Sequence, residues 1–297
     1  MDDTTLQFYA TAAPITALPF REFPAQLADL PHDPMTAGEV VRGLLIHRDW
    51  APVMGQQFSP ERVEDQQLRS TRDVVARILE LFDAPLTTER QLSDRMVGVC
   101  RHFATLHTAL LRHAGVPARA RVGFGGYFEA GWVDHWITEW WNGERWVRSD
   151  EQIFPQAAEV LGLTFDAHDQ PAGEFLTGAE AWQRCRAGTE DPNQFGIFDL
   201  RGLFFIVGSV IQDLGALNKV ELLPWDIWGR LEHGPGWQPT DAELAHIDAL
   251  AELVVRDDLG ELRSRFAEPD VTPTSGVTSM YDSNPTVLRI STSASRP

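Results

Sequence analysis

Residues 96–104 read MVGVCRHFA, and this stretch decides the fold. Apolar positions at helical spacing continue over residues 106–111, and Gly115 followed by Pro117 is typical of a helix end. The pattern predicts a helix of about four turns that begins at or near Cys100. The unpaired N–H groups and positive dipole end at a helix start lower the pKa of a thiol and can stabilise an oxyanion. Cys100 is therefore a candidate nucleophile.

Downstream of this helix the sequence changes to β-forming segments. Three of them follow one another, ARARVGFGGYF at 118–128, DHWITEWW at 134–141 and RWVRSDEQ at 145–152. The dipeptide Asn142-Gly143 between the last two is the strongest short signal for a hairpin. We therefore predict a small antiparallel sheet that follows the helix.

The hairpin brings two polar residues to the same end. His135 stands about seven residues before the turn and Asp150 about seven residues after it, so antiparallel pairing makes them near neighbours. A nucleophilic thiolate needs a proton-accepting partner, and that partner needs a group that orients it. The spacing predicts that Cys100, His135 and Asp150 form a catalytic triad for acyl transfer on an amide or ester.

Four short motifs in a fixed order resemble the bacterial transglutaminase-like superfamily, with its papain-like Cys-His-Asp core, over roughly residues 90–155. They are Gly98-Val99-Cys100-Arg101, Gly115-Val116-Pro117-Ala118-Arg119, His135-Trp136-Ile137-Thr138-Glu139 and Trp146-Val147-Arg148-Ser149-Asp150. The resemblance implies Cys100 as nucleophile, His135 as general acid and base, and Asp150 as the residue that orients His135.

The family includes transglutaminases, peptidases, amidases, deamidases and peptide N-glycanases, and some of its members have lost catalysis. Many relatives continue with Pro-Thr after the aspartate, whereas this chain has Glu151-Gln152. The resemblance therefore implies the chemistry and leaves the substrate open.

We expect an α+β fold with a papain-like, transglutaminase-like core, in which the helix that bears the cysteine packs on a small antiparallel sheet. Helical additions flank this core on both sides. The expected division is an N-terminal arm and helical layer at 1–85, a catalytic core at 86–155, a helical C-terminal extension at 156–267 and an extended or poorly ordered tail at 268–297.

Capping signals predict where the added helices begin. We expect an irregular arm over residues 1–35, and a continuous helical pattern from Val63 to Phe82. The predicted caps are Thr36 with Glu39, Ser59 before Pro60, Thr88 with Gln91, Thr177 with Glu180, and Thr240 with Glu243.

Three further residues are candidates for the cleft or substrate contact. His102 lies beside the nucleophile in sequence. It could line the cleft, or it could lie on the surface or behind the catalytic residues and support them. Trp136 could wall the cleft or serve packing. Glu139 could be a second polar contact, although a structural hydrogen bond to backbone or to an arginine is the favoured interpretation. No metal site is expected, since His102 and His107 do not share a helical face.

Composition limits the partners. Net charge is −18 with a pI near 4.8, and no cluster of Lys and Arg offsets it, which argues against nucleic acid. Two distant cysteines, Cys100 and Cys185, indicate a reducing compartment, and the acidic N-terminus lacks the features of a secretory signal. The longest apolar stretch, at 202–211, is too short to span a bilayer. We expect a cytoplasmic protein without cofactor.

The sequence thus predicts a cysteine-dependent enzyme that forms an acyl-enzyme from an amide, peptide or thioester carbonyl. Hydrolysis and transfer to an amine acceptor both remain open, as do the side chain that completes the oxyanion hole and the oligomeric state. The alternative is a non-catalytic binding or scaffold module that retains the fold. The Trp-rich stretch 222–239 could form a recognition surface or lid, or anchor a loop.

Overall fold

The computed structural model describes residues 1–128, 131–229, 233–273, 276–281 and 286–288. The chain divides into two compact units. The first contains Met1–Ala120 and Ile137–Pro171, and the second contains Arg121–Trp136 and Ala172–Pro297. Strands β3 (Ala118–Phe128) and β4 (Gly131–Trp141) carry the chain from the first unit to the second and back.

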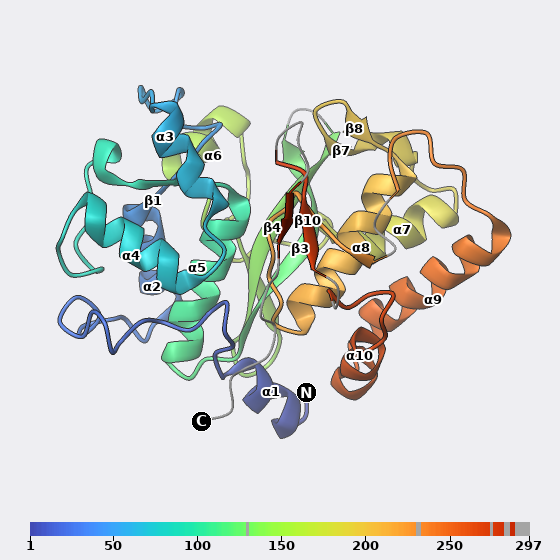
Figure 1. Ribbon diagram of the computed structural model, residues 1–297, viewed down its shortest axis with the longest axis horizontal. Coiled ribbons are helices and arrows are strands. Elements are labelled where there is room, and N and C mark those ends of the chain that lie inside the picture. Colours follow the sequence, from blue (N-terminus) through green and yellow to red (C-terminus); the bar gives the residue numbers. More distant parts are fainter. Residues whose placement is uncertain (129–130, 230–232, 274–275, 282–285, 289–297) are drawn as a thin grey trace. The chain divides into compact units, whose positions relative to one another are not determined.

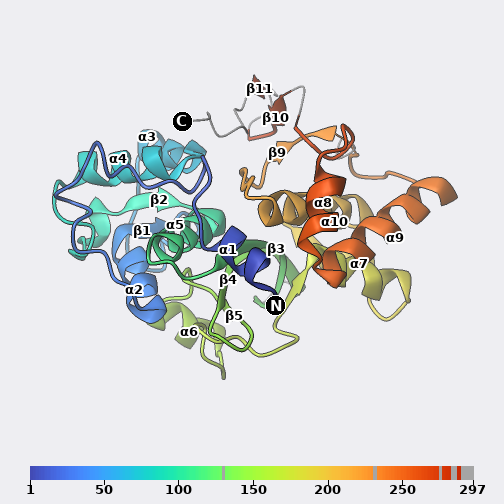
Figure 2. The ribbon, with the colours of Figure 1, turned by 90° about the horizontal axis from the view of Figure 1, so that it is seen from below.

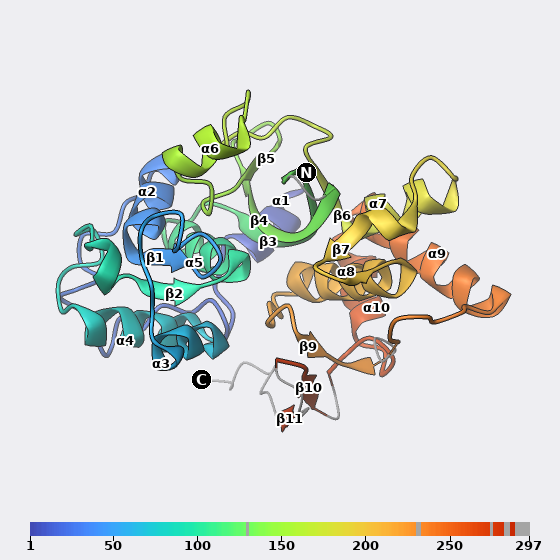
Figure 3. The same ribbon diagram turned by 90° about the horizontal axis from the view of Figure 1, so that it is seen from above.

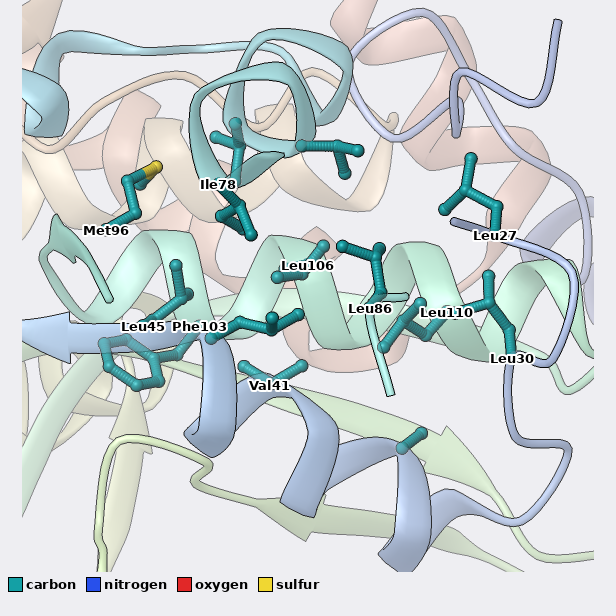
Figure 4. Packing of buried hydrophobic residues seen from close by; sticks show 14 of the residues in the cluster. Leu27, Leu30, Val41, Leu45, Ile78, Leu86, Met96, Phe103, Leu106 and Leu110 are labelled. Carbon is teal, nitrogen blue, oxygen red and sulfur yellow. The ribbon is translucent and has the colours of Figure 1, made fainter. Parts of the chain in front are cut away.

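The first unit is built around helix α5 (Cys100–His113). Its apolar face, with Phe103, Leu106 and Leu110, meets side chains from α2, α4 and the N-terminal arm in one buried cluster (Figure 4). A two-stranded parallel ladder of β1 and β2 lies beside α5 (Figure 3). The elements of this unit are α1 (Asp3–Tyr9), α2 (Pro34–Leu44), β1 (Leu45–His47), α3 (Pro60–Val63), a 3₁₀ turn at Glu64–Gln67, α4 (Thr71–Leu81), a 3₁₀ turn at Leu92–Asp94, β2 (Met96–Gly98), α5, β5 (Trp146–Ser149) and α6 (Pro155–Leu161).

Both ends of α5 lie where the sequence predicted them. The helix begins at Cys100 and spans 14 residues. It ends at His113, and Gly115 follows with φ of +78°, a left-handed conformation that glycine adopts at little cost.

Three predictions for the N-terminal layer were wrong. The arm is not entirely irregular, because Asp2 caps the short helix α1. Asp33, rather than Thr36, caps α2, and its side chain accepts the Thr36 N–H at 2.9 Å. Residue Gln91 precedes a 3₁₀ turn without a side-chain cap.

The continuous helix expected from Val63 to Phe82 is interrupted. Ser59 caps α3 as predicted, but that helix has only four residues, and a new cap at Ser70 begins α4. Between them the backbone carbonyls of Leu68 and Arg69 accept hydrogen bonds from side chains of α5. Carbonyls engaged in this way are not available to an unbroken helix.

The predicted hairpin is present in the first unit. The C-terminal half of β4 pairs antiparallel with β5, with Thr138 opposite Ser149 and Trp141 opposite Trp146. The connecting loop contains Asn142-Gly143, and the Asn142 side chain accepts the backbone N–H groups of Glu144 and Arg145 at 2.9 Å each. The loop is therefore longer than a two-residue turn, and an Asx turn stabilises it.

The second unit places helices beside a mixed sheet of strand order β6-β3-β4-β7-β8. Helix α8, which contains the apolar run after Gly202, packs against α7, and α7 packs against α9 (Figures 1 and 2). The capping boxes at Thr177 and Thr240 are confirmed. The elements are β3, β4, β6 (Phe175–Thr177), α7 (Gly178–Arg186), a 3₁₀ turn at Pro192–Gln194, β7 (Phe195–Ile197), β8 (Leu200–Arg201), α8 (Leu203–Leu217), β9 (Asp226–Ile227), α9 (Asp241–Arg256), α10 (Leu259–Phe266), β10 (Val277–Ser279) and β11 (Thr286–Leu288).

The overall class is α+β, as predicted. No helix in the described part of the chain is long and apolar enough to cross a membrane. In the Trp-rich stretch, Trp228 is buried and its indole N–H donates to the Val271 carbonyl at 2.8 Å, so this residue anchors its loop. Residues 230–232 of that stretch lie outside the described residues.

Candidate active site

Cys100 is the first residue of α5 and is almost fully buried, with 6% of its surface exposed. Strand β2 leads directly into it through Val99, whose extended backbone ends the strand and begins the helix. The sulfur therefore belongs to the turn where helix N–H groups lack partners within the helix. This is the position that the sequence predicted for a nucleophile.

His102 supports the start of this helix. Its Nδ1 accepts the Val99 N–H at 3.2 Å, so Nε2 carries the hydrogen and donates it to the Leu68 carbonyl at 2.9 Å. Burial lowers the pKa of His102 to about 3, and the ring stays neutral. Gly98 makes room for it, since a Cβ there would stand 3.0 Å from the His102 Cβ. The candidate cleft residue His102 is thus a buried structural cap.

The imidazole of His135 lies among aromatic rings of the second unit. The ring is 2% exposed and meets Phe128 at 5.0 Å and Tyr127 at 5.9 Å between centroids, both edge to face. Gly125 leaves space for these rings, because a Cβ there would approach Phe128 at 2.8 Å and Tyr127 at 3.0 Å. The sequence predicted only a β-forming segment at 118–128, and no local pattern identified Tyr127 and Phe128 as neighbours of His135.

Asp134 precedes His135 on β4 and is also buried. Burial raises the pKa of its carboxyl to about 7, and the opposing effect of His135 is smaller. Trp136, the next candidate, is 1% exposed, and its indole Nε1 has no hydrogen-bond partner among the described residues. A role for Trp136 in walling the cleft stays a prediction.

Asp150 directly follows β5 and is 1% exposed. Its backbone N–H donates to the Ala167 carbonyl at 2.8 Å, and its Oδ1 accepts the Gln152 N–H at 3.0 Å. These two bonds hold both the main chain and the carboxylate in one orientation. Such fixation is what an orienting residue of a triad requires.

Glu139 is held by two arginines. Arg119 Nε and Nη2 approach Oε2 at 2.9 Å each, and Arg148 Nε donates to Oε1 at 3.1 Å. The Arg119 guanidinium in turn lies 4.1 Å from the centroid of the Trp146 ring. The favoured interpretation of Glu139 as a structural partner of arginine agrees with these contacts.

The second cysteine lies at the opposite end of a helix from the first, since Cys100 begins α5. Cys185 lies in the last turn of α7, and burial together with Glu190 and Asp191 raises its thiol pKa to about 12. Neither cysteine forms a disulfide within the described residues. Across the same residues, no group of three or more His, Cys, Asp and Glu side chains is arranged to hold a metal ion.

Of the three predicted triad residues, Cys100 and Asp150 belong to the first unit, and both are buried at the ends of regular elements. His135 belongs to the part of β4 in the second unit, two positions before the strand passes into the first unit at Ile137.

One family model matches the part of the chain that contains these three residues. Residues 81–151 match the model of the transglutaminase-like superfamily. No curated protein matches the chain. A solved structure described as a "Putative Cysteine Protease from Cytophaga hutchinsonii" shares 17% identity over 51% of this chain and 43% of that one, with a TM-score of 0.29. The chain thus spans less than half of that protein's length.

Proposed function

We propose that the protein is an enzyme that uses Cys100, His135 and Asp150 for acyl transfer, because residues 81–151 match the model of the transglutaminase-like superfamily. The observation that carries the proposal is the placement of Cys100 at the first residue of α5, within the matched segment that also contains His135 and Asp150. Substrates are amide, peptide or thioester carbonyls in a peptide or a small molecule.

The register of the hairpin supports the pairing of His135 with Asp150. Thr138 is opposite Ser149, so the next pair in the same register is Ile137 with Asp150. Side chains alternate along a strand, and His135 therefore shares the face of Ile137. Diagonal neighbours of this kind in an antiparallel pair lie within reach of long side chains.

The direction of β4 relative to α5 supports the approach of His135 to Cys100. Within the first unit, Trp141 donates its N–H to the Pro117 carbonyl, just beyond the end of α5. Three residues earlier on the strand, the Thr138 hydroxyl donates to the Ala104 carbonyl in the first half of the helix. Within the first unit, β4 followed from Trp141 back to Thr138 therefore runs along α5 in the direction of Cys100.

The reaction follows from these roles. The Cys100 thiolate attacks the carbonyl carbon, and backbone N–H groups at the start of α5 stabilise the oxyanion. The protonated imidazole of His135 donates its proton to the leaving amine or thiolate as the bond to carbon breaks, which leaves an acyl-enzyme. Water or an amine then attacks the thioester, His135 takes up the proton of this nucleophile, and the Cys100 thiolate departs.

Hydrolysis and transfer to an amine both remain open for the second step. We also propose a cytoplasmic location, since a reactive thiol persists in a reducing compartment. The contrasting function is a non-catalytic binding module, and the experiment below distinguishes it from an enzyme.

The test is the pH dependence of alkylation by iodoacetamide, followed by mass spectrometry of the peptides that contain each cysteine. Cys100 should react with a midpoint well below the ordinary thiol pKa of about 8.5, and His135→Ala should remove this enhancement. Cys185 is the internal control and should stay unmodified at neutral pH. A Cys100 midpoint near 8.5 that His135→Ala leaves unchanged would favour the binding module.

A second experiment separates hydrolase from transferase. An acyl thioester probe loads Cys100, and the acyl-enzyme is then divided between water and added amines. Faster loss of the acyl group with rising amine concentration, together with an amide product, indicates a transferase. A rate that is independent of the amine indicates a hydrolase.

A further inference from the structure

Glu151, the residue after Asp150, is the centre of a buried charged cluster in the first unit. Its side chain is 1% exposed. His107 Nδ1 from α5 lies 3.3 Å from Oε1, and His168 Nδ1 lies 3.3 Å from Oε2. Arg42 Nη2 from α2 stands 3.8 Å from the same oxygen. Groups from three separate parts of the chain thus converge on one carboxylate.

The hydrogen bonds of the two histidines fix where their protons lie. His168 Nε2 accepts from Arg42 Nη1 at 2.8 Å, so its Nδ1, which lies 3.3 Å from Glu151 Oε2, carries the hydrogen. His107 Nε2 is 3.1 Å from the Pro34 carbonyl and must donate to it. In the neutral ring the His107 Nδ1 then carries no hydrogen, so His107 lies against Glu151 without donating to it.

The charges of the cluster support a carboxylate at this position. Burial opposes ionisation, but the positive charge of His168 and Arg42 outweighs it and contributes to a Glu151 pKa of about 2. The hydrogen bond to Glu151 raises the pKa of His168, while burial lowers that of His107. The exposed Glu39 also faces His168, at 3.3 Å from Nε2.

The same short segment holds Asp150 and Glu151 side by side. Ala167 accepts the Asp150 N–H at 2.8 Å, and the next residue, His168, contacts the Glu151 carboxylate. Gly38 of α2 leaves the space that the carboxylate occupies, because a Cβ there would lie 2.4 Å from Oε2. The end of β5 is therefore attached to α2 and α5 through the residue next to Asp150.

We propose that Glu151 is a positioning residue for Asp150. Its carboxylate, paired with Arg42 and His168 and packed against His107, clamps the end of β5 to the helix that begins at Cys100, and this fixes the carboxylate that orients His135. The inference rests on the proposed triad. The clamp acts through Asp150 alone and touches no substrate.

The test measures the pH midpoint of Cys100 alkylation in the full-length protein. Glu151→Gln keeps the shape of the side chain and removes its charge. The expected result is a midpoint shifted upward toward 8.5 and alkylation at pH 7 slowed by roughly tenfold or more, because misplaced orienting groups weaken the thiolate-imidazolium pair. Gly38→Ala displaces the same carboxylate without changing its charge and should shift the midpoint in the same direction.

The matched control is Asp65→Asn. Asp65 is another buried carboxylate of the first unit, 7% exposed and paired with Arg62 and Arg77. This variant should lower the melting temperature as Glu151→Gln does, but leave the alkylation midpoint unchanged. A general loss of stability is thereby separated from a loss of positioning.

A double variant tests the route of the effect. If Glu151 acts through Asp150, Glu151→Gln adds no further shift in the midpoint when Asp150→Asn is already present. If Glu151→Gln adds its full shift on top of Asp150→Asn, the clamp is overturned. The clamp is also overturned if the wild-type midpoint lies well below 8.5 and Glu151→Gln leaves it unchanged. A wild-type midpoint near 8.5 that His135→Ala leaves unchanged instead overturns the triad and the clamp with it.

Discussion

Glu139 lies four residues after His135 on β4, yet both of its oxygens accept hydrogen bonds from arginines. Arg119 comes from β3 and Arg148 from β5, so the carboxylate joins three neighbouring strands. The main contribution of such a buried carboxylate to stability is that it neutralises the arginines buried beside it. Position on the same strand as a candidate catalytic histidine is thus insufficient to assign a catalytic role.

Glu139→Gln should be strongly destabilising. It leaves the Arg119 guanidinium, which is 2% exposed, without its carboxylate. Removal of one member of a buried ion pair costs about 3–5 kcal/mol of unfolding free energy. Urea denaturation measures the change. Asp169→Asn, which breaks an exposed pair with Arg145, is the control and should cost about 1 kcal/mol or less. Equal effects of the two variants would contradict the structural role of Glu139.

Asp134 should make stability depend on pH. Burial raises the pKa of its carboxyl to about 7, whereas the unfolded chain titrates near about 3.9. The folded state therefore retains a proton that the unfolded state has released, and stability falls as the pH rises through this window. Asp134→Asn should raise the melting temperature more at pH 8 than at pH 4.

The melting temperature of Asp134→Asn and of wild type can be followed by circular dichroism at both pH values. Asp199→Asn, at an exposed position between β7 and β8, serves as the control with little change at either pH. A gain of equal size at pH 4 and pH 8 would show that the carboxyl of Asp134 is not the titrating group.

At the scale of the element, features encoded by neighbouring residues were predictable, and those imposed from a distance were not. The start of α5 at Cys100 and the capping boxes at Thr177 and Thr240 follow from local patterns. The break between α3 and α4 depends on α5 side chains that take backbone carbonyls about thirty residues earlier in the chain. The helix propensity of residues 63–82 gives no information about those hydrogen-bond partners.

The candidate site shows the same division. Spacing and motif order indicated Cys100, His135 and Asp150, because a helix start and a hairpin register are local properties. The rings of Tyr127 and Phe128 against His135 depend on how they fold over Gly125, which the sequence showed only as a glycine-rich run. The cluster around Glu151 joins residues over a hundred positions apart and has no local signal.

Gly115 offers a test of the predicted end of α5. Its φ of +78° is costly for any residue with a Cβ, and no neighbouring atom among those described lies within 4 Å of the place where a Cβ would stand. Gly115→Ala should therefore cost about 1 kcal/mol from backbone strain alone. Thermal unfolding measures this cost. Gly234→Ala, at an open site without positive φ, is the control and should be neutral or slightly stabilising.

At the scale of the whole molecule, acidic residues greatly outnumber basic ones, with 43 Asp and Glu against 25 Lys and Arg. Many of the arginines are engaged in ion pairs, as in the contacts of Arg62, Arg72 and Arg77. The excess negative charge repels itself in the compact state. Salt should therefore stabilise this protein.

Raising the concentration of NaCl from roughly 0.01 M to 0.1 M shortens the screening length from about 30 Å to about 10 Å. The melting temperature at pH 7.5 should rise over this range. KCl at the same ionic strength is the control and should give the same rise. Differential scanning calorimetry measures the shift. A fall in melting temperature would mean that screened ion pairs stabilise the fold more than the net charge destabilises it.

The pairing of β3 and β4 with strands encoded later in the chain has a consequence for gene fusion and recombination. The family segment at 81–151 includes residues 121–136, whose strand partners β6 and β7 are encoded after residue 171. Gene fusion or recombination at the borders of that segment would separate these strands from the neighbours they pair with. A chimaera that exchanges residues 81–151 alone should therefore be less stable than one that exchanges this segment together with the strands encoded after residue 171.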